Sequence, residues 1–164
     1  MSTEDRQQRI VPSVLDRLLV PEEWEQGDES TFGWYEHLRR LKSVVRRDLE
    51  ALLNTRQLLA ATRAAANDEV QHSILTYGLP DFSALNVSSQ SDRHVVRQAL
   101  ERAIRIFEPR LDPVRVVMEE TDVKDRRLRF RIEAVLQVQP TPEPVTFDAV
   151  LQVTTQEYRV ERQD

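Results

Sequence analysis

One acid and one base flank a proline in the run Phe107-Glu108-Pro109-Arg110-Leu111, and these charges are the best placed in the chain for chemistry or docking. A proline disfavours helical backbone at the residue before it, so a helix that reaches Phe107 should stop here. Alternating apolar and polar residues begin at Val114, which indicates a strand. Glu108 and Arg110 are therefore predicted to lie at a helix-to-strand corner that holds two opposite charges in fixed directions.

A carboxylate at such a corner could be the general acid of a glycosidase, which needs two carboxyl groups beside a cleft. The second carboxyl could belong to Asp112, Glu119 or Asp81, but the chain has 28 acidic residues, which supply many such pairs by chance. Arg110 favours the ionised form of Glu108, which is the wrong direction for a general acid. We therefore expect no enzymatic activity, and a cell-wall hydrolase is the alternative.

Other reaction chemistries lack the residues or the spacing that they need. His37, His72 and His94 are isolated in sequence and there is no cysteine, so we expect no metal site. The three glycines are too far apart for a phosphate-binding loop, and we expect no cofactor. The sequence leaves a Ser-His-Asp triad open, although it contains no nucleophile elbow of the G-x-S-x-G type.

The composition fits one globular domain of 164 residues, with 40% hydrophobic and 31% charged residues. The net charge of -5 argues against general nucleic-acid binding, which needs a positive surface. No apolar run approaches the ~20 residues of a membrane span, so we expect no direct membrane insertion. The absence of cysteine suits a reducing cytoplasm.

Two long helices are predicted from apolar residues at steps of three and four. The first runs from Trp34 to Asn54, where Asn54 is a plausible left-handed stop. The second runs from Asp92 to Phe107, with Ser91 as its cap. The first helix also has a basic face, which we interpret as solvated, with an acidic protein partner as the alternative; it comprises Arg39, Arg40, Lys42, Arg46 and Arg47.

The last third of the chain alternates apolar and polar residues three times over, which predicts three strands. Turns are expected at Asp122 to Asp125 and at Pro140 to Pro144. The pattern predicts an α+β fold, a two-layer single domain in which the two long helices pack on a three-stranded antiparallel β-meander. The last strand, Val145 to Thr154, has little charge and would be open to pairing with a foreign strand.

The remaining segments are predicted to be an arm and a bend. Residues 1–30 form a partly disordered N-terminal arm with a short amphipathic helix from Ile10 to Val20, and residues 31–164 form the α+β domain. Gly78 and Pro80 mark a turn that Tyr77 and Phe82 should pin to the core.

Five strings of residues together resemble one known family. They are Pro12-Ser13-Val14-Leu15-Asp16-Arg17-Leu18, Arg47-Asp48-Leu49-Glu50-Ala51-Leu52-Leu53-Asn54-Thr55-Arg56, Tyr77-Gly78-Leu79-Pro80-Asp81, Phe107-Glu108-Pro109-Arg110-Leu111 and Val145-Thr146-Phe147-Asp148. Each string alone is weakly specific, but the five in this order resemble the TssE family of type VI secretion baseplate components. That family is related to a small wedge protein of contractile phage tails and has an old "lysozyme-like" label.

The resemblance implies a structural protein that joins the baseplate wedge to the contractile sheath. Glu108, Pro109 and Arg110 are implied to dock onto the TssF–TssG part of the wedge, with TssK as a further baseplate partner. Arms of the TssB–TssC sheath are implied to add as strands to the edge of the sheet, where main-chain hydrogen bonds give affinity. The implied location is the cytoplasm, at the inner face of the inner membrane within the baseplate.

The predicted last strand is our candidate for receiving the sheath arm. Its inward-facing residues are Val145, Phe147, Ala149, Leu151 and Val153. A peptidoglycan hydrolase and a regulatory protein-binding adaptor are the alternative functions.

Overall fold

The computed structural model of the chain describes residues 34–58, 67–83, 85, 86, 89–119, 127–139, 141–152 and 157–162. The predicted N-terminal arm, the turn at Asp122 to Asp125 and the candidate residue Val153 lie outside the described residues.

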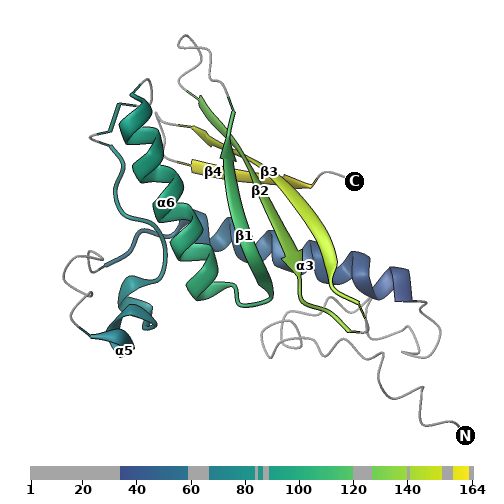
Figure 1. The fold of residues 1–164 in the computed structure, drawn as a ribbon. Coiled ribbons are helices and arrows are strands. Elements are labelled where there is room, and N and C mark those ends of the chain that lie inside the picture. The colour runs from purple at the N-terminus through teal and green to yellow at the C-terminus, as the bar shows by residue number, and fades with distance from the viewer. Residues whose placement is uncertain are drawn as a thin grey trace, which may run out of the picture.

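The described residues form an α+β fold with one antiparallel sheet in the order β1-β2-β3-β4 (Figure 1). The elements in chain order are α3 (Trp34–Asn54), α5 (Asp68–Gln71), the 3-10 turn η2 (Ile74–Thr76), α6 (Gln90–Phe107), β1 (Leu111–Met118), β2 (Arg127–Leu136), β3 (Glu143–Gln152) and β4 (Glu157–Arg162).

The sheet has four strands, so the prediction of three was wrong. β4 follows β3 and pairs with it from Gln152 opposite Glu157 to Phe147 opposite Arg162. The sequence pattern missed β4 because only two apolar residues, Tyr158 and Val160, alternate there with charged ones. Both of these side chains are buried in the core.

The two predicted helices are present. α3 has the expected bounds, whereas α6 begins at Gln90, earlier than predicted. The cap of α6 is Ser89 and not Ser91, because the Ser89 hydroxyl accepts the hydrogen bond from the backbone N–H of Asp92.

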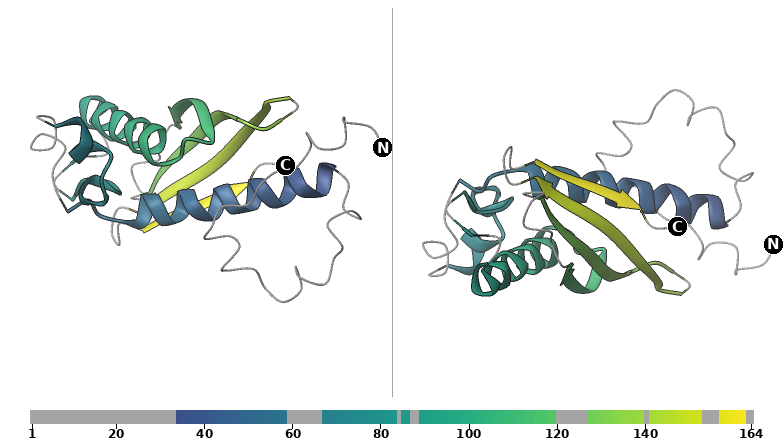
Figure 2. Two further views of the ribbon diagram at one scale, coloured as in Figure 1. Left: turned by 90° about the horizontal axis from the view of Figure 1, so that it is seen from below. Right: turned by 90° about the horizontal axis from the view of Figure 1, so that it is seen from above.

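The core lies between the helices and one face of the sheet. α6 lies beside β1, and Figure 2 shows β4 running along α3, so each helix flanks one edge strand. The sheet therefore has one dry face, as the period-two pattern predicted. The largest fully buried side chains come from both layers and include Phe130, Phe147, Leu49, Leu52, Leu100, Ile104 and Ile132.

The predicted bend at Gly78 is pinned to the end of α3. Gly78 has a φ of 99°, which favours glycine, and a Cβ there would lie 2.2 Å from the backbone oxygen of Thr55. The backbone N–H of Leu79 donates to the same oxygen over 2.8 Å. Tyr77 packs edge-on against Phe107 with ring centroids 5.2 Å apart, so the bend also contacts the end of α6.

Candidate docking site

The predicted corner between α6 and β1 is present. Glu108 caps α6, and its backbone N–H donates to the oxygen of Ile104 over 2.8 Å. The backbone N–H of Leu111 then donates to the oxygen of Glu108, and the oxygen of Arg110 accepts from Gln137 at the end of β2. The backbone around Pro109 is therefore fixed to both the helix and the sheet.

The side chains at this corner form an ion network that we call the corner cluster: Arg47, Asp48, Glu108 and Arg110. The Arg110 Nε and Nη2 each donate to one oxygen of Glu108 over 2.5 Å. The same Nη2 donates to Asp48 on α3 over 2.6 Å, and Arg47 donates to the other oxygen of Asp48 over 2.8 Å. The cluster therefore ties α3 to the corner through the two carboxylates that share Arg110.

Burial differs sharply within the corner cluster. Only 5% of the Glu108 side chain is exposed, against 29% of Arg110 and 23% of Asp48. Pro109 is exposed. The corner thus holds both charges in fixed directions, as predicted, but Glu108 points inward and the outward face consists of Pro109 and part of Arg110.

Burial and charge act in opposite directions on the Arg110 guanidinium. Burial lowers the pKa of Arg110, but hydrogen bonds and charge attraction from Glu108 and Asp48 outweigh it and raise that pKa above its usual value. Burial also raises the pKa of Tyr77, and the negative charges of Asp48 and Glu108 raise it further. Arg110 therefore stays charged, and Tyr77 stays neutral near neutral pH.

One Arg110 nitrogen is directed at solvent. Of the three guanidinium nitrogens of Arg110, Nη1 donates to no acceptor among the described residues. In the same part of the chain, no buried side-chain nitrogen or oxygen lacks a hydrogen-bond partner. Nη1 is therefore not fully buried, and the bonds from Nε and Nη2 to Glu108 and Asp48 fix the plane of the guanidinium group. A rigid donor of this kind can bind a carbonyl or carboxylate oxygen of another protein with little loss of side-chain entropy.

Two of the three carboxylates considered as catalytic partners of Glu108 are engaged elsewhere. Asp81 pairs with Arg56 over 3.8 Å, and Glu119 pairs with Arg131 over 3.4 Å. Asp112 is exposed at the start of β1. Sequence reasoning missed Asp48, the carboxylate that does share Arg110 with Glu108, because no spacing rule connects positions so far apart in the chain.

The basic face of α3 is partly engaged inside the molecule. Lys42 pairs with Glu143 over 3.0 Å, Arg47 bonds Asp48, and Arg46 donates to the backbone oxygen of Val160 over 3.4 Å. The contacts of Lys42 and Arg46 anchor the helix to β3 and β4. They weaken the interpretation of this face as a contact for an acidic partner.

The strand predicted to receive a sheath arm is not an edge strand. β3 pairs with β2 on one side and with β4 on the other, so its backbone groups are used on both sides. The four described candidates point into the core and are buried: Val145, Phe147, Ala149 and Leu151. The prediction of an open edge at β3 was wrong because the sequence pattern did not reveal β4. The edges of the sheet are β1 and β4.

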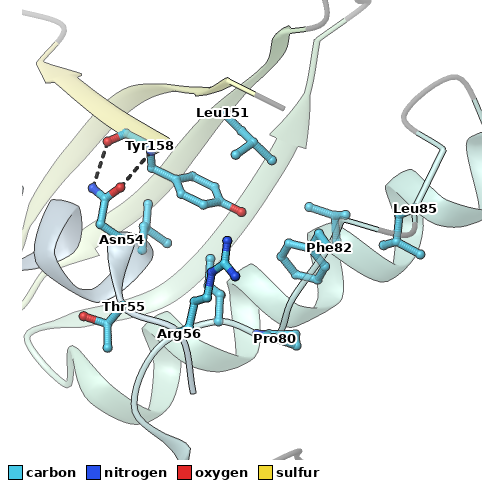
Figure 3. Close-up of a pocket in the computed structure, with 11 residues that line it drawn as sticks. Asn54, Thr55, Arg56, Pro80, Phe82, Leu85, Leu151 and Tyr158 are labelled. Carbon is cyan, nitrogen blue, oxygen red and sulfur yellow. Dashed lines mark hydrogen bonds between the residues drawn. The ribbon is translucent and has the colours of Figure 1, made fainter. Parts of the chain in front are cut away.

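A small pocket lies where the end of α3 meets β4 and the segment after Gly78 (Figure 3). Its volume is about 40 Å³, with walls that include Leu53, Leu79, Phe82 and Leu151. The Tyr158 ring enters it, and burial raises the pKa of Tyr158. The pocket has room for a few water molecules, so it is too small for a cofactor.

The described part of the chain contains no group of three His, Asp or Glu side chains that could hold a metal ion. Within it, no helix has the length and apolar character that a membrane crossing requires.

Comparisons with known proteins place this geometry in a family. The anti-adapter protein IraD of Salmonella arizonae (strain ATCC BAA-731 / CDC346-86 / RSK2980) is 32% identical over 133 residues, which cover 81% of this chain and 86% of that protein. The family model of baseplate wedge protein gp25 matches residues 39–141. That range is more than half of the chain and contains the whole corner cluster. The chain belongs to the family of baseplate wedge protein gp25.

Proposed function

We propose that this protein is a non-enzymatic structural component of a type VI secretion baseplate, of the TssE kind, that joins the wedge to the contractile sheath. The observation that supports this most is the gp25 family match, because it spans the corner cluster, all of α6 and most of α3. In this proposal the protein works in the cytoplasm, at the inner face of the inner membrane.

The proposed wedge contact is the exposed part of the corner. Pro109 supplies a rigid apolar surface, and the solvent-facing Nη1 of Arg110 supplies a fixed donor for an oxygen of TssF or TssG. In this proposal Glu108 does not contact the partner, and its role is to hold the Arg110 guanidinium in place from the buried side. TssK is a further proposed neighbour in the same assembly.

The proposed sheath contact is an edge of the sheet, where an arm of the TssB–TssC sheath adds as a strand. Strand addition needs backbone N–H and C=O groups that face away from the sheet, and these occur on β1 and β4.

The test of the wedge contact is co-expression with TssF and TssG followed by affinity purification. Pro109→Glu places a charge on the exposed face without touching an internal bond, so recovery of the wedge proteins should fall about tenfold. The matched control is Gln98→Glu, which adds the same charge at an exposed position of α6. Normal recovery with Pro109→Glu would contradict the docking proposal, provided that circular dichroism shows a folded protein.

Hydrolysis of cell wall is disfavoured by the contacts of Glu108. Both of its oxygens accept from Arg110 and its side chain is almost fully buried, so it is badly placed to protonate a leaving group. Release of soluble fragments from peptidoglycan by the purified protein, lost in Glu108→Gln, would overturn the non-enzymatic proposal.

The relative named an anti-adapter supports a second candidate function, a regulatory adaptor that binds another protein through the same fold. A pull-down from the native host separates the two. Recovery of wedge and sheath proteins supports the baseplate proposal, whereas recovery of a regulator alone supports the adaptor.

A further inference from the structure

Two adjacent apolar side chains on the 3-10 turn η2 face solvent. Ile74 is 85% exposed and Leu75 is 41% exposed, although both are large hydrophobic residues. A single exposed apolar residue is normal, but two neighbours on an ordered turn form a surface that another molecule can cover. The pair is therefore a candidate for an apolar contact.

The shape of the η2 turn is fixed by two hydroxyl groups. The Thr76 side chain is buried, and its hydroxyl lies within 3.1 Å of the backbone oxygens of Val70 and Ser73. The Ser73 hydroxyl donates to the same oxygen of Val70 and accepts from the backbone N–H of Leu75. The backbone of the turn is thus already ordered, so a partner that binds its two apolar side chains has little further ordering to impose.

The turn is also attached to the last part of α6. Arg102 of α6 donates to the side-chain oxygen of Gln71 over 2.6 Å, and the ring of Tyr77, which follows the turn, packs against Phe107. Figure 1 shows the segment that contains α5 and η2 beside the end of α6 that leads into β1. Because Phe107 directly precedes Glu108, the turn lies next to the corner.

The exposed surface of α6 between the turn and the corner is basic. Arg102 and Arg105 are both exposed and are three residues apart, a spacing that places them on one face of the helix. The acids nearest to them in sequence are turned elsewhere, since Glu101 accepts from the N–H of Val116 on β1 and Glu108 is buried. We call four exposed residues the apolar-basic strip: Ile74, Leu75, Arg102 and Arg105.

We propose that the apolar-basic strip is a second contact for the protein partner that docks at the corner, and that this partner presents an apolar pocket with carboxylates at its rim. The pocket takes Ile74 and Leu75, and the carboxylates face Arg102 and Arg105. This inference rests on the proposed function, because it presupposes that a partner docks at Pro109. It is supported by the contact between the turn and the corner and by the positive charge of the strip.

Two other occupants fit the strip less well. A second copy of this chain in a twofold contact would place the same strip against itself, so its arginines would meet like charges. A flat anionic lipid surface would also meet Asp68 and Glu69 of α5, which are exposed shortly before the turn. A protein partner can instead be shaped to cover the strip and leave these two acids in solvent.

The test is Ile74→Asp in the protein co-expressed with the wedge proteins TssF and TssG. A carboxylate that enters an apolar pocket near other carboxylates should lower the recovery of the wedge proteins about tenfold or more. The matched control is Leu58→Asp, which makes the same change at an apolar residue that is 82% exposed. Its recovery should stay within about twofold of the parent chain, and circular dichroism should show a native fold for both variants.

The charge of the strip is tested with Arg105→Glu, which reverses a charge at an exposed position of α6. Recovery of the wedge proteins should fall about fivefold at low salt, and less at high salt, where the contact of the parent chain is already screened. Arg39→Glu makes the same change at an exposed position of α3 and should leave recovery within about twofold.

Normal recovery with both Ile74→Asp and Arg105→Glu would overturn the inference, while loss with Pro109→Glu in the same experiment would leave the corner contact in place. Equal loss with Leu58→Asp would also overturn it, because the effect would then not be specific to the strip. A dimer of the purified parent chain that Ile74→Asp dissociates in sedimentation would assign the strip to a second copy and overturn the inference. Absence of the wedge proteins from the parent complex would instead overturn the proposed function.

Discussion

Replacing Arg110 with alanine should destabilise the fold by about 3 kcal/mol, because it leaves the Glu108 carboxylate buried without its partner. Removing one member of a buried ion pair typically costs 3–5 kcal/mol. We place the value at the low end because 29% of the Arg110 side chain is exposed, and because Asp48 keeps its bond to Arg47. The assay is urea unfolding followed by far-ultraviolet circular dichroism at neutral pH.

Other variants of this ion pair should also lower the free energy of unfolding, by different amounts. Glu108→Gln keeps the shape but sets an amide N–H₂ against an Arg110 donor, which should cost about 1–2 kcal/mol. Glu108→Ala combined with Arg110→Ala should cost less than the sum of the two single variants, by about 1–3 kcal/mol, because the residues bond directly. Arg39→Ala removes an exposed arginine of α3 and serves as the control, with an expected change within about 0.5 kcal/mol.

A loss below about 0.5 kcal/mol in Arg110→Ala would refute the reasoning, since the charge of Glu108 would then need no compensation. The predicted loss also changes how docking is tested. A variant that removes both Glu108 and Arg110 weakens the fold as well as the contact, so failure to bind would be ambiguous. Pro109, which is exposed, separates the two effects.

Three further predictions concern the fold. Gly78→Ala should destabilise by about 3 kcal/mol or more, because the residue has a φ of 99° and its Cβ would meet the oxygen of Thr55; thermal unfolding measures this. Phe147→Ala should cost about 3–5 kcal/mol in urea unfolding, and a near-neutral result would contradict its place in an interior strand. Burial raises the pKa of Tyr158, so the unfolded chain releases that proton first. Stability should be full below about pH 10 and fall as the pH rises further, and Tyr158→Phe should lose part of this fall in thermal scans between about pH 8 and 11.

The helices and three of the strands could be predicted because their buried residues repeat with the period of the element. Val96, Leu100 and Ile104 on α6 are spaced by four and all face the core. β4 could not be predicted in the same way, because Tyr158 and Val160 are too few to establish a period against four charged residues. Because of that one missing strand, the edge of the sheet was predicted at β3, whereas it lies at β4.

The corner itself could also be predicted, since Pro109 fixes where the helix stops. Its side-chain contacts could not, because Asp48 reaches Arg110 from a helix that lies far away in sequence. Asn54 is a second residue whose side-chain contact could not be predicted from the sequence. It has the sequence signature of a helix stop, yet its amide pairs with the backbone of Tyr158, a contact set only by how α3 lies along the sheet.

The string from Arg47 to Arg56 makes three separate attachments between α3 and the rest of the fold. Asp48 binds the corner through Arg110, Asn54 binds β4, and the Thr55 oxygen binds the bend at Leu79. Substitutions in this string should therefore act on stability first and on binding only through it. Pro109 at the corner lies outside this string and is exposed. Under the proposed function, a wedge contact at the corner and a sheath contact at an edge of the sheet would lie on separate elements, so a substitution at Pro109 should weaken the first without changing the second.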